Sequence, residues 1–338
     1  WNPDWSTDWF SWADLRSKDT AGGRARRDSY SLSDDRTVGY AAIERMFMFD
    51  RRLILMAGLR HDKVYYESRS VPAYSDGDWT RSLGCNWNPY GDNRLVVFGN
   101  YSTSCNTELT VDNGTHTVMP METGRGLETG ARAALFHGKL NLTASAFQIE
   151  KHNMPQNNPD YYFEGTGTPE YTSTGVHRVR GADMELLCKP FAGLRVLVTA
   201  AYLDAKVVES TDIRYPVGSR KIRTPDKTLS LALSYKFPGL LRGFSASARM
   251  SYRSGYVDSN YIAASSVTPG ENNAEQLYYF APSLTLFGGS LKYDWKRKKT
   301  AQTISLTASN LLDKRYAGTT RNLGIGRQIT LGYSVTFR

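Results

Sequence analysis

The carboxy-terminal segment alternates strictly between apolar and polar side chains. Its apolar positions are Ile329, Leu331, Tyr333, Val335 and Phe337, and only Gln, Thr, Gly and Ser stand at the positions that alternate with them. A period of two predicts a β-strand with one apolar and one polar face. The same pattern recurs at 227–237, 243–256 and 301–311. Because soluble sheets alternate in the same way, the pattern by itself does not separate a soluble protein from a membrane protein.

Strand patterning recurs along most of the chain, in about thirteen segments. The predicted strands are 37–49, 53–68, 79–88, 95–105, 124–136, 139–152, 177–188, 194–208, 227–237, 243–256, 277–294, 301–311 and 327–337. Many of them exceed the roughly five or six residues of a globular strand. Their length is typical of tilted strands that cross a bilayer.

The predicted connections alternate between short turns and long polar loops. Short turns are expected at 50–52, 89–92, 137–138, 190–193, 238–240 and 296–300, and long loops at 69–78, 106–123, 153–176, 209–226, 257–276 and 312–326. Outer-membrane barrels combine short periplasmic turns with long external loops. The connections therefore favour an antiparallel transmembrane β-barrel, whereas a β-sandwich gives no reason for this regularity.

The odd strand count affects the expected domain organisation. Bacterial barrels normally close with an even number of strands, and an open edge would expose unpaired backbone groups to lipid. Further strands are therefore expected upstream of Trp1. On this interpretation residues 1–36 form an extracellular loop segment, and residues 37–338 form the carboxy-terminal part of the barrel.

The end of the chain carries a family resemblance. Asn310, Leu311, Asp313 and Tyr316, followed by a strand that ends at Phe337, resemble the carboxy terminus of TonB-dependent outer-membrane receptors. The stretches 122–140 and 179–194 are similar to further hairpins of that family. The motif residues resemble structural elements rather than ligand contacts.

The resemblance implies a 22-stranded barrel, of which about thirteen strands are expected here. It also implies an amino-terminal plug domain that carries the segment for a TonB-type energy-coupling protein. Neither is expected within these residues, so this segment alone should not transport a ligand. The implied location is the outer membrane of a Gram-negative bacterium, with membrane lipid, the plug and the coupling protein as partners.

Composition excludes several other classes. No apolar stretch approaches the roughly 18 residues of a membrane helix. The formal net charge is +9, but the cations are spread along the chain, which argues against a nucleic-acid partner. The three cysteines lack any paired spacing, and none of the five histidines pairs at metal-ligand spacing. No catalytic residue, metal site or cofactor is expected, and the chain is not expected to be an enzyme.

Two groups of residues are candidates for ligand or plug contact. Trp5, Trp9 and Trp12 crowd into the first twelve residues and could stack on an aromatic or sugar-like ligand, although packing against neighbouring loops is the simpler interpretation. Lys236, Arg249 and Arg253 alternate with apolar residues. They are expected to face the barrel lumen, where they would contact the plug or attract an anionic substrate.

The leading functional hypothesis is energy-coupled import of a scarce ligand across the outer membrane. The sequence leaves the ligand open among siderophores, cobalamin, haem and oligosaccharides. Two alternatives also remain at this point. One is a passive porin or channel, which would lack a plug, and the other is a secreted β-sandwich binding module.

Overall fold

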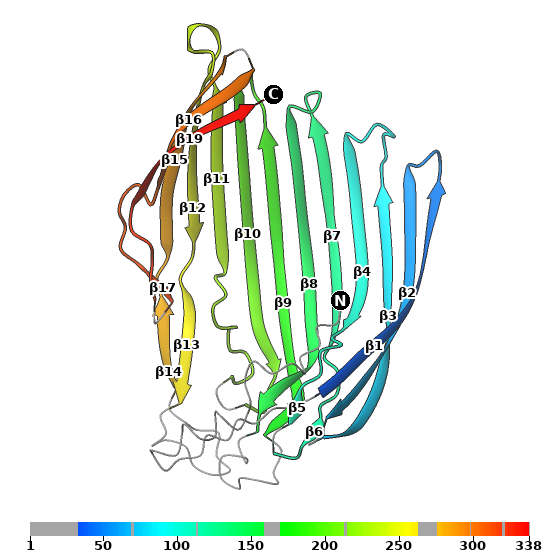
Figure 1. The fold of residues 1–338 in the computed structure, drawn as a ribbon. Coiled ribbons are helices and arrows are strands. Elements are labelled where there is room, and N and C mark those ends of the chain that lie inside the picture. Colours follow the sequence, from blue (N-terminus) through cyan, green and yellow to red (C-terminus); the bar gives the residue numbers. More distant parts are fainter. Residues whose placement is uncertain are drawn as a thin grey trace, which may run out of the picture.

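A computed structural model describes residues 33–68, 71–112, 114–158, 170–212, 215–262, 276–297, 299–319 and 322–337. Thirteen antiparallel strands form one curved sheet in which each strand pairs with the next along the chain (Figure 1). These strands are β1 (Ser33–Met48), β2 (Leu53–Ser68), β3 (Val71–Trp87), β4 (Leu95–Cys105), β7 (Thr123–Leu135), β8 (Leu140–Asn157), β9 (Tyr171–Cys188), β10 (Leu194–Glu209), β11 (Lys227–Lys236), β12 (Phe244–Arg253), β15 (Leu284–Arg297), β16 (Thr300–Ser309) and β19 (Gln328–Phe337). Within the described residues β1 and β19 are the two edges.

The predicted strands correspond in number and order to the thirteen strands of the main sheet, and most bounds agree within a few residues. β1 begins at Ser33 rather than at 37, so the strand takes in part of the segment that was expected to be a loop. The long loop predicted at 69–78 is wrong. Ser68 already pairs with Val71 after a register shift, and β3 continues through 71–78. Cross-strand pairing with β2 therefore overrides the turn-forming composition of that segment.

The strand predicted at 277–294 is two elements. Its first part is β14 (Gln276–Ala281), which pairs with β13 (Tyr256–Ile262) in a separate two-stranded sheet. β15 then begins at Leu284 and joins the main sheet. Pro282 stands between them, and a proline lacks the backbone N–H that a continuous ladder requires.

Short turns gather at one end of the sheet, and the longer connections gather at the other end (Figure 1). The turn after β1 places Phe49, Asp50 and Arg51 at positive φ, and the turn after β7 does the same with Phe136 and His137. A 3-10 helix, η1 (Gly239–Leu241), closes the turn between β11 and β12. The longer connections carry small hairpins, namely β5 (Val111–Asp112) with β6 (Thr117–Val118), β13 with β14, and β17 (Ala317–Thr319) with β18 (Asn322–Leu323).

The sheet has one apolar and one polar face. The register aligns Leu331 of β19 with Leu306 of β16 and with Leu291 of β15. These side chains are 71%, 45% and 58% exposed, so a whole apolar face lies uncovered by protein. A soluble β-sandwich would bury this face under a second sheet, whereas a transmembrane barrel presents it to lipid. No helix within the described residues is long and apolar enough to cross a membrane.

Candidate functional site

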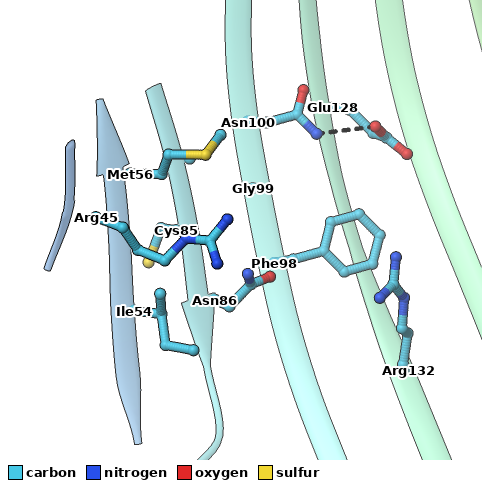
Figure 2. Close-up of a pocket in the computed structure, with 11 residues that line it drawn as sticks. Arg45, Ile54, Met56, Cys85, Asn86, Phe98, Gly99, Asn100, Glu128 and Arg132 are labelled. Carbon is cyan, nitrogen blue, oxygen red and sulfur yellow. Dashed lines mark hydrogen bonds between the residues drawn. The ribbon is translucent and has the colours of Figure 1, made fainter. Parts of the chain in front are cut away.

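The polar face of β1 to β7 holds a concavity of about 380 Å³ (Figure 2). Arg45 extends from β1 across β2 toward Asn86 of β3 (Figure 2). On the far side, the amide nitrogen of Asn100 donates a 2.9 Å hydrogen bond to Glu128 on β7. The guanidinium of Arg132 lies 5.1 Å above the ring of Phe98. Amide, carboxylate and guanidinium groups thus surround this concavity. They suit polar contacts with a protein domain that fills a barrel lumen, such as a plug.

A glycine on β7 makes room for one wall of this concavity. A Cβ at Gly130 would lie 2.6 Å from the Phe98 ring and 2.4 Å from the carbonyl oxygen of Ala144. The missing side chain therefore lets the aromatic ring of β4 lie across the backbone of β7, where it supports Arg132.

A second group of polar residues, two lysines, a histidine and a glutamate, lies at the long-loop end of the same face. The strand registers pair Lys151 of β8 with His177 of β9, and His177 with Val207 of β10. The ammonium of Lys221, in the loop after β10, lies 3.4 Å from Nδ1 of His177. Glu122 forms a 2.9 Å ion pair with Lys151. We refer to Lys151, His177 and Lys221, with Glu122, as the mouth cluster.

The loop backbone fixes Lys221 in the mouth cluster. The amide of Lys221 donates to the carbonyl of Ala205, and the amide of Val207 donates to the carbonyl of Ser219. The loop thus continues the sheet beside β10. Burial lowers the pKa of Lys221 from its usual range, and the neighbouring charge of Lys151 lowers it further. Positive charge is therefore concentrated in a poorly solvated position, which favours binding of an anion there.

Next to the mouth cluster lies a pocket of about 560 Å³ between the 219–224 loop and the β13–β14 hairpin. Its lining combines the cations Arg220 and Lys221 with the apolar groups of Tyr256, Phe280 and Pro282. The amide of Arg223 donates to the carbonyl of Val257, which ties the two loops together. We call this concavity the loop pocket. Its chemistry suits a ligand with both anionic groups and flat apolar surface.

The three cations that were predicted to face the lumen, Lys236, Arg249 and Arg253, all lie on the polar face of the sheet, but they are far apart along the strands. Lys236 pairs with Ser245 near the short turns, and Arg249 pairs with Ala232 near the middle of the strand. Arg253 lies at the long-loop end, roughly 27 Å from Lys236 along the strand. There its guanidinium lies 4.6 Å over the ring of Tyr256 and donates to the carbonyl of Pro282 at 3.3 Å. Arg253 thus borders the loop pocket, and plug contact by Lys236 and Arg249 stays a prediction.

The carboxy-terminal motif residues hold their loop together. The buried side chain of Asn310 donates to the carbonyls of Lys314 and Ile325 and accepts from the amide of Lys314. Asp313 accepts from the amide of Arg327, and the ring of Tyr316 fills the space beside Gly324. Leu311 donates its amide to the carbonyl of Phe287. Phe337 is 80% exposed on the apolar face at the strand end.

The three tryptophans that were predicted as ligand contacts, Trp5, Trp9 and Trp12, lie outside the described residues. The mouth cluster was not predicted, because Lys151, His177 and Lys221 are far apart in the sequence and only the strand register and the loop after β10 bring them together. Within the described part of the chain, no group of three or more His, Cys, Asp or Glu side chains is placed to hold a metal ion.

A single curved sheet with an uncovered apolar face, a polar opposite face and charged long loops defines a transmembrane β-barrel protein. The TonB dependent receptor-like β-barrel family model matches residues 2–311, and the chain belongs to this family. The predicted fold class, transmembrane barrel, is thereby confirmed, as is its place in the Gram-negative outer membrane. Members of this family are transporters rather than enzymes.

Relatives and solved structures agree on this assignment. The metal-pseudopaline receptor CntO of Pseudomonas aeruginosa is 28% identical over 197 residues, which cover 58% of this chain and 24% of that protein. The pyoverdine receptor FpvA of P. aeruginosa superposes with a TM-score of 0.73 at 17% identity, over 92% of this chain and 43% of that one. The ferric preacinetobactin receptor BauA of Acinetobacter baumannii gives 0.72 at 21% identity, over 91% and 44%. The chain thus spans about a quarter of the curated relative and under half of either structure.

Proposed function

We propose that this chain supplies barrel strands to an energy-coupled receptor that imports an anionic metal chelate of the siderophore class. The observation that carries the ligand class is the mouth cluster, where Lys151, His177 and Lys221 are held together with one carboxylate beside the partly apolar loop pocket. A chelate whose carboxylate or phenolate groups surround a metal offers complementary charge and flat apolar surface. A neutral oligosaccharide would offer no charge complementary to the ammonium groups of Lys151 and Lys221.

The names of related proteins support the same class. The P. aeruginosa relative is described as a metal-pseudopaline receptor, and the two solved structures are a pyoverdine receptor and a ferric preacinetobactin receptor. In the proposed cycle the external loops capture the chelate and the mouth cluster orients it. A plug inside the barrel then opens a path when a TonB-type coupling protein acts on it. Trp5, Trp9 and Trp12 are proposed as further stacking contacts.

A direct binding comparison tests the ligand class. The receptor, purified from outer membranes in detergent, would be titrated with a carboxylate-bearing metal chelate and with a neutral oligosaccharide of similar size. The proposal predicts that the chelate binds and that its affinity falls as salt is raised, because exposed charges are screened. Binding of the oligosaccharide alone would contradict it.

The passive porin is the rival within the same fold. A porin would pass small solutes without regard to a specific ligand, whereas a receptor whose lumen is closed by a plug would not. Conductance of the receptor in a planar bilayer separates the two. A large permanent conductance would favour the porin, and a closed barrel favours the receptor.

A further inference from the structure

The apolar face of β7 to β10 is built in regular rows. The register aligns Leu135, Leu140 and Cys188 beside the short turns. Counted from this first row toward the long-loop end, the fourth row aligns Thr129, Ala146, Ala182 and Tyr202. These four rows span roughly 20 Å along the strands, which is comparable with the apolar band of an outer-membrane barrel.

The next two rows on this same face are charged. The fifth row aligns Leu127, Gln148, Arg180 and Asp204, and the sixth aligns Arg125, Glu150, Arg178 and Lys206. The sixth row continues onto β3, because the amide of Arg81 donates to Thr103, and Thr103 pairs with Arg125. We call Arg81, Arg125, Arg178, Arg180 and Lys206, with Glu150 and Asp204, the headgroup patch.

The carboxylates of the headgroup patch already have cationic partners. Glu150 is buried and accepts from Nε of Arg125 at 2.8 Å, and Asp204 pairs with Lys206 at 3.0 Å. Arg180 is exposed, and its Nε donates to the neutral amide of Gln148. Five cations thus accompany two carboxylates, so the patch is net positive at the level where the apolar band ends.

An apolar groove on the same face adjoins the headgroup patch, on the side nearer the short turns. It encloses about 680 Å³ and is lined by Leu83, Tyr101 and Leu127, among others. The space beside Gly99 in this groove is open. A Cβ added there would have only one atom within 4 Å, the carbonyl oxygen of Glu128 at 3.7 Å. The groove residues Leu83, Tyr101 and Leu127 form the row next to that of Arg81 and Arg125, one row closer to the short turns. Cations above an apolar groove match a lipid whose phosphates lie above its acyl chains.

We propose that the headgroup patch and this groove form a binding site for the phosphorylated glycolipid of the outer leaflet. Short turns are periplasmic in outer-membrane barrels, so the long-loop end with the patch faces outward. Guanidinium groups bind phosphate oxygens through paired hydrogen bonds. Cationic clusters at the membrane surface bind anionic headgroups. The acyl chain of the same lipid would lie in the groove beside Gly99.

Native mass spectrometry of the receptor, purified from outer membranes in detergent, tests this site. The probes are diphosphoryl lipid A, the same lipid without phosphates, and phosphatidylglycerol. The double variant Arg178→Gln with Arg180→Gln spares the Arg125–Glu150 pair and should bind diphosphoryl lipid A roughly tenfold more weakly. The matched control is Lys189→Gln, which removes an exposed cation from the short turn at the other end of β9.

A second variant tests the groove independently of charge. Gly99→Leu should weaken lipid A retention while leaving the barrel resistant to SDS at room temperature, which reports correct folding. Unchanged lipid A binding by the Arg178 and Arg180 double variant would overturn the proposal. So would equal binding of the dephosphorylated lipid or of phosphatidylglycerol, or displacement of lipid A by millimolar inorganic phosphate.

Discussion

The ammonium nitrogen of Lys221 lies 3.4 Å from Nδ1 of His177, although the two residues are 44 positions apart in the sequence. The contact exists because the loop after β10 folds back along that strand, where Arg220 forms an isolated bridge with Lys206 and backbone hydrogen bonds tie the loop to Ala205 and Val207. Lys151 from β8 and its partner Glu122 complete the group. The mouth cluster therefore depends on the sheet register and on the loop together.

Loss of the Lys221 charge should weaken capture of an anionic chelate. Lys221→Gln is expected to raise the dissociation constant roughly three- to tenfold, as expected for loss of one partly buried cation. Isothermal titration of the purified receptor at low salt measures this change. Lys139→Gln, in the exposed turn between β7 and β8, is the matched control. Equal affinities of the two variants would argue against a role for the mouth cluster.

Asp112 should make the loop end of the protein sensitive to acid. Burial raises the pKa of its carboxyl, but the amides of Tyr171 and Thr115, which donate to it at 2.7 and 2.8 Å, outweigh this and hold the pKa below its usual range. The ionised form is thus favoured in the folded state. Its stabilisation is fully present above the ordinary carboxyl pKa and is lost as pH falls through the depressed value.

Limited proteolysis between pH 7 and pH 3, with an acid-active protease at low pH, measures this effect. Cleavage of the segment around Asp112 should increase only at the acidic end of the range. Asp112→Asn should show increased cleavage already at pH 7, because the neutral amide is a weaker acceptor for the two backbone donors. A variant as resistant as the wild type at pH 7 would mean that the carboxylate does not anchor the loop.

Asn310 should stabilise the last external loop. Asn310→Ala removes two donated hydrogen bonds and one accepted bond, and each buried group left unpaired costs about 1–3 kcal/mol. The temperature at which the barrel loses its SDS-resistant mobility should fall. Leu312→Ala, at a 70% exposed side chain in the same loop, serves as the control and should change little. A lowered midpoint for Leu312→Ala alone would contradict this assignment.

Gly130 and Gly126 provide a matched pair on β7. A Cβ at Gly130 would lie 2.4 Å from a backbone oxygen, whereas at Gly126 the nearest atoms are 3.8 Å away. Gly130→Ala should therefore reduce the amount of folded barrel in the outer membrane several-fold, and Gly126→Ala should not. Quantitative immunoblots of unheated membrane samples make the comparison. Similar yields for both variants would show that the sheet relaxes around the added carbon.

The strands were predictable from sequence because their signal is local. The alternation at 329–337 reflects the two faces of a single strand, so neighbouring residues suffice to identify it. The segment 71–78 misled the prediction because Asp76, Gly77 and Asp78 have turn-forming composition, yet pairing with β2 holds them in a strand. The mouth cluster and the headgroup patch depend on which strands are neighbours and in what register. Composition and period carry no such information.

Energised uptake tests the proposed function most directly. Cells that produce the complete receptor would be given a radiolabelled anionic metal chelate, with and without a protonophore that collapses the inner-membrane proton gradient. The account predicts accumulation that requires the receptor, stops when the gradient is collapsed, and falls in the double variant Lys151→Gln with Lys221→Gln. Uptake that continues unchanged without the gradient would contradict energy-coupled import and indicate a passive channel.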